Sequence, residues 1–199
     1  MSRTTAILAV EDKLSEAVSI KILEDRGIGI SQQLVLKGKG YLEKKAQSLN
    51  QTAKAIPVFM LTELDSPGQC PPQLVRSWIK GGQNPKFFLR VAVMEVESWI
   101  MADRKGFADF LSIPIHRIPR NTDAIPQPKE FLVSLARLSK KARLREDIVP
   151  APGATSQVGP RYNSCLWEFV RVRWNIQLAA SVSRSLKRTL ERLRTFDAM

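Results

Sequence analysis

Residues 5–12 read Thr-Ala-Ile-Leu-Ala-Val-Glu-Asp, an apolar run that ends in two acids. A short, uninterrupted run of this kind is typical of a strand that is buried on both faces of a parallel sheet. Two more apolar runs are followed by acids: Ile56–Leu61 by Glu63 and Asp65, and Phe87–Met94 by Glu95 and Glu97. Three predicted strands are therefore each followed closely by carboxylates.

Strands and helices are predicted to alternate through the first hundred residues. This order indicates an α/β fold, with a parallel, Rossmann-like sheet of about four strands and flanking helices. The remaining predicted elements are a short strand at Leu34–Leu36 and helices at Leu14–Arg26, Tyr41–Leu49, Pro71–Trp78 and from near Glu97.

The acids after these strands are predicted to meet. In an open parallel sheet, the residues just past the carboxyl ends of neighbouring strands converge on one crevice, where ligands bind. Carboxylates gathered there repel one another unless a hard cation lies between them, and Mg²⁺ prefers oxygen ligands. We therefore expect a divalent-metal site, with Mg²⁺ or Mn²⁺, that includes Glu11, Glu63 and Asp65.

Each acid also has a simpler interpretation. Glu11 and Asp12 could begin a helix, where the dipole favours negative charge, and on this ground Asp12 is left out of the predicted metal site. Glu63 and Asp65 could be turn formers ahead of Ser66-Pro67-Gly68. One of Glu95 and Glu97 could face solvent.

The chain changes character after Asp103. Prolines interrupt it at several positions, and a Pro- and Gly-rich loop at Pro150–Pro160 either folds over another part of the protein or acts as a connector. We therefore predict an α/β core at residues 1–104 and a helical, loop-rich, basic extension at residues 105–199, packed on that core. Its predicted helices are Lys129–Arg143, Asn163–Arg173 and Val182–Arg194.

The positive charge is concentrated in the second half. The chain carries a net charge of +12, and residues 101–199 hold 18 Lys/Arg against 9 Asp/Glu, whereas residues 1–100 hold 13 against 10. A basic surface of this kind suits the phosphates of nucleic acid, although a solvated surface or a face for an acidic partner protein would have the same composition. The candidate nucleic-acid-binding residues are Arg137, Lys140, Lys141, Arg143, Arg161, Arg184 and Arg188.

Several classes of function are disfavoured. Two cysteines, Cys70 and Cys165, are too few for a disulfide framework or a zinc site, and a single histidine, His116, excludes a multi-histidine metal centre. The chain has no P-loop motif, so any nucleotide hydrolysis would come from a partner. No signal peptide or membrane-spanning run is evident, and we expect a cytoplasmic protein without a membrane partner.

The acidic motifs resemble those of TOPRIM domains. Val10-Glu11-Asp12 resembles their glutamate motif, and Thr62-Glu63-Leu64-Asp65 resembles their Asp-x-Asp motif with Glu in the first position. Segments 95–103, 120–129 and 158–163 are similar to a small TOPRIM-like family of bacterial proteins. Members of that family tend to be encoded beside AAA-type ATPases in defence modules, which implies an ATPase partner.

The resemblance implies roles for individual residues. Asp65 would ligate Mg²⁺ directly, Glu63 would ligate it or hold a bound water, and Glu97 would complete a two-metal site as in OLD-type nucleases. Glu11 would ligate a metal or act as general base. Lys129 is the candidate for a lysine that counters transition-state charge.

The leading hypothesis is therefore a metal-dependent nuclease that hydrolyses phosphodiester bonds of DNA or RNA, as the effector of a defence complex. One alternative is a receiver-like domain with Asp65 as phosphoacceptor. Another is a degenerate TOPRIM-like scaffold that binds nucleic acid or assembles without catalysis. Homo-oligomerisation is left open.

Overall fold

The computed structural model describes residues 4–64, 66 and 68–196. Its strands are β1 (Thr5–Val10), β2 (Gly29–Val35), β3 (Val58–Glu63) and β4 (Phe87–Ala92). Its α-helices are α1 (Lys13–Asp25), α2 (Lys39–Thr52), α3 (Pro71–Trp78), α4 (Val96–Ala102), α5 (Arg104–Leu111), α6 (Pro128–Arg137), α7 (Ala142–Ile148), α8 (Tyr162–Val172), α9 (Ile176–Val182) and α10 (Arg184–Leu193). Three short 3₁₀ turns are η1 (Ile115–Arg117), η2 (Thr122–Ala124) and η3 (Arg194–Phe196).

The four strands form one parallel sheet in the order β2-β1-β3-β4. This confirms the predicted α/β class and the parallel sheet of four strands. Strands β1 and β3 lie in the middle, and their residues are nearly all buried because helices cover both faces. Strands β2 and β4 form the two edges.

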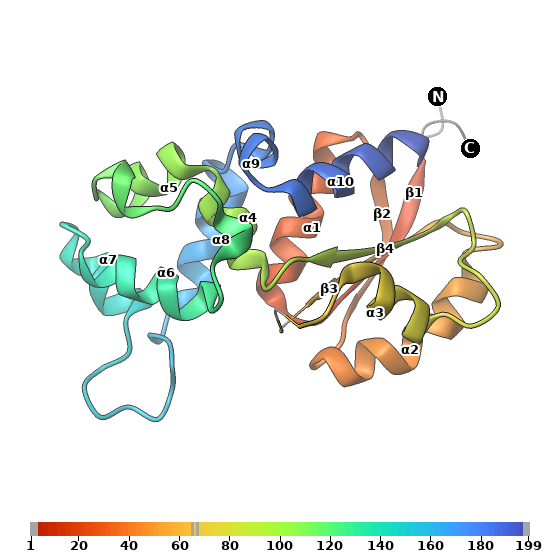
Figure 1. The fold of residues 1–199 in the computed structure, drawn as a ribbon, viewed down its shortest axis with the longest axis horizontal. Coiled ribbons are helices and arrows are strands. Elements are labelled where there is room, and N and C mark those ends of the chain that lie inside the picture. The colour runs from red at the N-terminus through yellow and green to blue at the C-terminus, as the bar shows by residue number, and fades with distance from the viewer. Residues whose placement is uncertain (1–3, 65, 67, 197–199) are drawn as a thin grey trace.

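Alternate residues of each central strand enter different cores. In β1, Leu8 and Val10 pack in the core that contains α1 and α10, whereas Ile7 and Ala9 pack in the core that contains α2 and α3. The sheet therefore lies between two helical layers, and α10 returns from the end of the chain to cover β4 (Figure 1).

The second half of the chain continues the first of these cores. Helix α1 packs against α8, and α4 packs against α9, so one hydrophobic cluster extends from the sheet into α4–α10. Helices α5, α6 and α7 lie beside the sheet, beyond the carboxyl ends of its strands (Figure 1). This arrangement brings the N-termini of α4 and α6 close to those strand ends.

Several predicted boundaries are wrong. The second strand begins at Gly29 and not at Leu34, because the polar residues of edge strand β2 face solvent and leave no apolar run. The helix predicted at Lys129–Arg143 ends at Arg137, and α7 follows as a separate helix. The break is held by Ser139, whose hydroxyl donates to the Leu111 carbonyl at 2.6 Å. Helices α5 and α9 were not predicted.

The described residues include no helix that is both long and apolar enough to cross a membrane.

Candidate functional site

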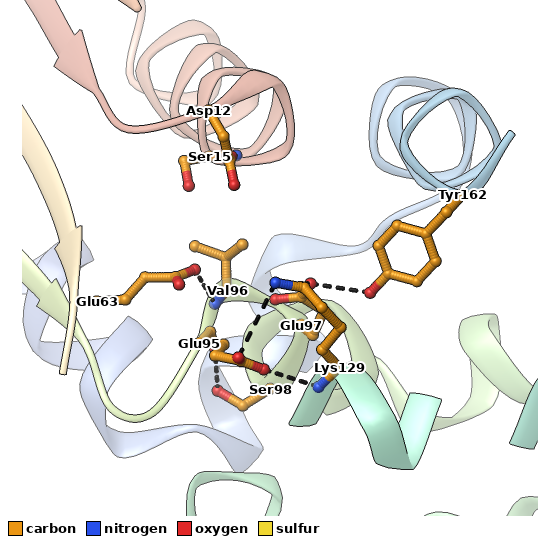
Figure 2. A network of polar contacts seen from close by, with 9 residues as sticks. All are labelled: Asp12, Ser15, Glu63, Glu95, Val96, Glu97, Ser98, Lys129 and Tyr162. Atoms are coloured by element: carbon orange, nitrogen blue, oxygen red, sulfur yellow. Dashed lines mark hydrogen bonds and ion pairs between the residues drawn. The ribbon is translucent and has the colours of Figure 1, made fainter. Parts of the chain in front are cut away.

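Carboxylates from three strand ends lie at the carboxyl edge of the sheet. Glu11 directly follows β1, and Glu63 is the last residue of β3. The sequence had predicted this strand to end at Leu61. After β4 the chain turns into α4, with Glu95 as its N-cap and Glu97 in its first turn. Figure 2 shows Glu63, Glu95 and Glu97 close together, with Asp12 facing them.

Glu11 is tied to the end of β3. Its Oε1 accepts hydrogen bonds from the Thr62 hydroxyl at 2.5 Å and from the Glu63 backbone N–H at 3.2 Å. Thr62 is fully buried, so this bond fixes the direction of the Glu11 side chain. Glu11 and Glu63 are therefore neighbours at the carboxyl edge of the sheet.

Glu63 is buried and faces the start of α4. Its Oε1 accepts a hydrogen bond of 2.8 Å from the Val96 N–H, an otherwise unsatisfied donor in the first turn of that helix. Burial raises the pKa of Glu63 well above its ordinary value, and the negative charges of Glu97, Asp12 and Glu11 raise it further. The backbone bond from Val96 opposes this shift only in part.

Glu97 is the most deeply buried acid of the site, with 1% of its surface exposed. The Tyr162 hydroxyl donates a hydrogen bond of 2.8 Å to its Oε1, and Lys129 Nζ lies 3.7 Å from the same oxygen. Burial raises the pKa of Glu97, while Lys129 and the bond from Tyr162 act against that rise. The pKa of Tyr162 is also raised, by burial first and then by the charge of Glu97.

Lys129 connects α6 to the acids that follow β4. Its backbone N–H donates to Glu95 Oε2 at 2.7 Å, and its Nζ lies 4.0 Å from Glu95 Oε1 (Figure 2). Burial lowers the pKa of Lys129, but the charges of Glu97, Glu95 and Glu63 outweigh this and raise the pKa overall. The ammonium group is thus held in its charged form next to two carboxylates.

A cavity of about 300 Å³ opens beside these groups. Asp12, Glu97, Lys129 and Tyr162 line it, and residues 156–158 of the Pro- and Gly-rich loop form part of its wall. The end of that loop therefore lies beside the acidic site; the sequence had left open whether the loop folds over another part of the protein or acts as a connector. Asp12 caps α1 by accepting from the Ser15 N–H at 2.8 Å, as its position suggested, and also faces the cavity.

The structure describes only some of the predicted metal-ligating residues. Asp65 lies outside the described residues, so its position relative to Glu11 stays a prediction. In the part of the chain that is described, no three His, Cys, Asp or Glu side chains form a group that could hold a metal ion. Sequence reasoning missed Tyr162, although it lies in the Val158–Asn163 segment that carries the family resemblance, and it had discounted Asp12.

The predicted nucleic-acid-binding residues line different cavities. Lys141, Arg143 and Arg161 line a cavity of about 520 Å³ beside α7 and α8, while Arg184 and Arg188 line another beside β4. Lys141 also donates to the Phe110 carbonyl at 2.7 Å and so stabilises the end of α5. Arg137 and Lys140 are exposed. Binding of nucleic acid by these residues stays a prediction.

Comparison with known protein families, with curated proteins and with solved structures finds no match to this chain.

Proposed function

We propose that the chain is a divalent-metal-dependent nuclease. One observation carries the proposal: Glu63 and Glu97 are buried together at the carboxyl edge of a parallel sheet, with their pKa values raised by burial, and Lys129 lies beside Glu97. Buried carboxylates that repel one another are costly in a purely structural role. A cation would remove that cost, and perturbed acids that face a cavity are typical of functional sites.

The donor chemistry suits a hard cation. Glu11, Glu63, Asp65 and Glu97 would hold Mg²⁺ or Mn²⁺ through carboxylate oxygens, with no sulfur or imidazole ligand. The proposal requires Asp65, because the described acids by themselves form no complete ligand group. When bound, the ion would supply Lewis-acid stabilisation of the charge on a phosphodiester.

The protein's own groups would position the reactants and take up the proton of the attacking water. The Lys129 ammonium would neutralise negative charge that develops on the phosphate, and the positive surface residues would hold the polyanion. Glu11, fixed by Thr62, would accept the proton of the attacking water. The loop segment 156–158 would restrict access of bulk water to the cavity. An ATPase partner, implied by the family resemblance, would control this activity.

The test combines metal binding with cleavage. Mn²⁺ binding is followed by electron paramagnetic resonance, and cleavage of plasmid DNA and of structured RNA is followed with Mg²⁺. Glu97→Gln and Asp65→Asn should each lower cleavage at least ~100-fold and weaken Mn²⁺ binding. Glu43→Gln, at an exposed position of α2, is the matched control and should change neither.

Three results would reject the proposal. Cleavage that survives EDTA, or that is unchanged in both variants, would exclude these acids as the catalytic site. A phosphoryl adduct on Asp65 after incubation with acetyl phosphate, without cleavage, would favour the receiver-like alternative. Salt-sensitive binding of nucleic acid that is unchanged in both variants, with no cleavage under any metal, would indicate a non-catalytic scaffold.

A further inference from the structure

Strand β4 is an edge of the sheet, and half of its backbone groups point away from β3. The Lys86 and Ala92 carbonyls accept from Val58 and Leu64 N–H groups of the β3 segment, each at 3.0 Å. In a parallel pair alternate residues bond to the same neighbour, so residues 86, 88, 90 and 92 face β3. The backbone groups of residues 87, 89, 91 and 93 therefore face outward.

Both ends of this outward row are already covered by other groups. The Phe87 carbonyl accepts from Gln83 Nε2 at 2.6 Å, and the Phe87 N–H donates to the Asn84 carbonyl at 2.9 Å. At the other end the Val93 N–H donates to Ser185 Oγ at 3.4 Å, and its carbonyl accepts from Ser98 Oγ at 3.1 Å. The edge is thus closed at Phe87 and at Val93.

Leu89 and Val91 lie between these closed ends. Among the described residues, nothing forms a hydrogen bond with their outward N–H and C=O groups. Only 2% and 6% of their surfaces are exposed, and both residues line a cavity. Buried backbone groups without partners are costly, and an open strand edge readily pairs with another extended chain.

A cavity of about 630 Å³ lies over these two residues, between α3 and α10. Figure 1 shows β4 running between the two helices. Helix α3 contributes an apolar wall through Pro72 and Val75, to which the Leu89 and Val91 side chains add. The opposite wall, from α10, carries Arg184 and Arg188.

The cavity is strongly basic. Arg76 and Arg90 also line it, and burial, with the nearby charges of Arg192 and Arg188, lowers the pKa of Arg90 to about 10. The acid that lines it, Asp123, is already bonded to Ser183 Oγ at 2.7 Å and to the Ser185 N–H at 3.0 Å. Because four arginines of the described chain line the cavity with this one acid, a positive charge remains that an acidic ligand would neutralise.

We propose that the edge of β4 is a docking site for an extended acidic segment of a partner protein, which adds a fifth strand over Leu89 and Val91. The partner's backbone would satisfy the four outward groups. Side chains of an added strand alternate between its two sides, so one set would face the apolar wall of α3 and the other would face the arginines of α10. The preferred segment therefore alternates apolar and acidic residues. This site is separate from the carboxylates proposed for nuclease activity.

A labelled peptide tests this proposal on the full chain. We expect a fluorescein-labelled peptide of alternating valine and glutamate to bind, as measured by fluorescence anisotropy. A peptide with lysine in place of glutamate should bind at least ~tenfold more weakly. Two further peptides carry N-methyl groups on every second amide, each on the amides that the other leaves free. One should lose binding, because its methylated amides face β4, and the other should bind as before, because only every second amide of a strand faces its neighbour.

Two protein variants separate the backbone from the charge contribution. Leu89→Pro removes an outward N–H that is not used by β3, a position where an edge strand tolerates proline, and Leu89→Ala is its control. The charge reversal Arg184→Glu with Arg188→Glu is compared with Lys187→Glu and Arg194→Glu, which lie beside a different cavity. Leu89→Pro should bind the peptide at least ~fivefold more weakly than Leu89→Ala, which also loses the leucine side chain but keeps the N–H. The Arg184→Glu, Arg188→Glu pair should weaken binding at least ~fivefold, and its control pair should change binding at most about twofold.

Three results would overturn the proposal. The first is no measurable binding of the valine–glutamate peptide to a folded wild-type chain. The second is equal binding of both N-methylated peptides, which would mean that charge alone holds the peptide. The third is displacement of the peptide by a mononucleotide or a short oligonucleotide whose own binding is lost in Leu89→Pro, which would assign the cavity to a phosphorylated ligand. If Leu89→Pro does not fold, the Arg184→Glu, Arg188→Glu variant and the two N-methylated peptides decide the outcome.

Discussion

The Tyr162 hydroxyl donates a hydrogen bond of 2.8 Å to Glu97 Oε1, and both groups are buried. This contact joins α8 to α4 and closes one side of the acidic cavity. It also opposes the rise that burial causes in the pKa of Glu97. Removing the hydroxyl leaves a buried carboxylate with one hydrogen bond fewer, which costs more than the loss of an exposed bond.

Tyr162→Phe should therefore lower the free energy of unfolding by about 1–3 kcal/mol at neutral pH. Chemical denaturation followed by circular dichroism measures this loss. Tyr41→Phe is the control, because Tyr41 is 62% exposed and should be replaceable at almost no cost. Equal stability of the two variants would mean that the Tyr162–Glu97 bond contributes nothing to folding.

Glu63→Gln should make the protein less sensitive to alkaline pH. The folded pKa of Glu63 is raised, so the stability of its protonated form is fully present below its unfolded pKa of ~4.3 and is lost as pH rises through the raised value. Glutamine keeps an oxygen that can accept from the Val96 N–H and carries no charge. We expect melting temperatures of variant and wild type to agree near pH 4 and to diverge as pH rises.

At pH 8 the Glu63→Gln variant should melt about 2–4 °C higher than the wild type, which corresponds to roughly 1 kcal/mol for a domain of this size. Differential scanning calorimetry across the pH range measures the divergence. Glu43→Gln should follow the wild-type curve because Glu43 is exposed. A difference that is independent of pH would exclude titration of Glu63 as its cause.

Lys129→Met should destabilise the protein at neutral pH. The methionine keeps most of the aliphatic length but removes the ammonium group that lies 3.7 Å from Glu97 and 4.0 Å from Glu95. Since the Lys129 side chain is 35% exposed, solvent screens the loss, and we expect about 1–2 kcal/mol instead of the larger cost of breaking a fully buried pair.

The surface pair of Lys105 and Asp109 offers a control for this change. Lys105→Met breaks an ion pair whose side chains are 74% and 64% exposed, and solvent screening should make its effect on the free energy of unfolding much smaller than that of Lys129→Met. Urea denaturation at pH 7 and at pH 4 compares the two variants. The deficit of Lys129→Met should shrink at the lower pH, where Glu97 is protonated. A deficit no larger than that of Lys105→Met would contradict the prediction.

Gly106→Ala should destabilise α5, although alanine normally favours a helix over glycine. Asp103 Oδ1 accepts from the Gly106 N–H at 3.1 Å, and its Oδ2 accepts from the Asn175 N–H at 2.9 Å. A Cβ on residue 106 would overlap the Asp103 carboxylate and force it away from both donors. The expected loss is about 1–3 kcal/mol.

Gly40→Ala is the matched test, because a Cβ at that position in α2 would meet no atom within 4 Å. It should stabilise the protein by about 0.5–1 kcal/mol through the unfolded chain. Opposite signs for the two substitutions, measured by chemical denaturation, would support the Asp103 contact. A gain in stability for Gly106→Ala would refute it.

The central sheet could be predicted because its signals are local. Strands β1, β3 and β4 are formed mainly by apolar runs, and nearly all of their residues are buried. The edge strand β2 was predicted five residues too late because its exposed glutamines, Gln32 and Gln33, carry no pattern of burial. The break after Arg137 was missed because it depends on a bond from Ser139 to Leu111, which is distant in the sequence.

The local order of residues was sufficient to indicate a parallel sheet and to place Glu11 and Glu63 at its carboxyl edge, because strand burial and chain direction are encoded in short segments. Packing of α4, α6 and α8 against that edge then determined which acids lose contact with water and which acquire Lys129 or Tyr162 as partners. Those contacts join residues far apart in the chain, and no short segment encodes the desolvation that raises the pKa values of Glu63 and Glu97.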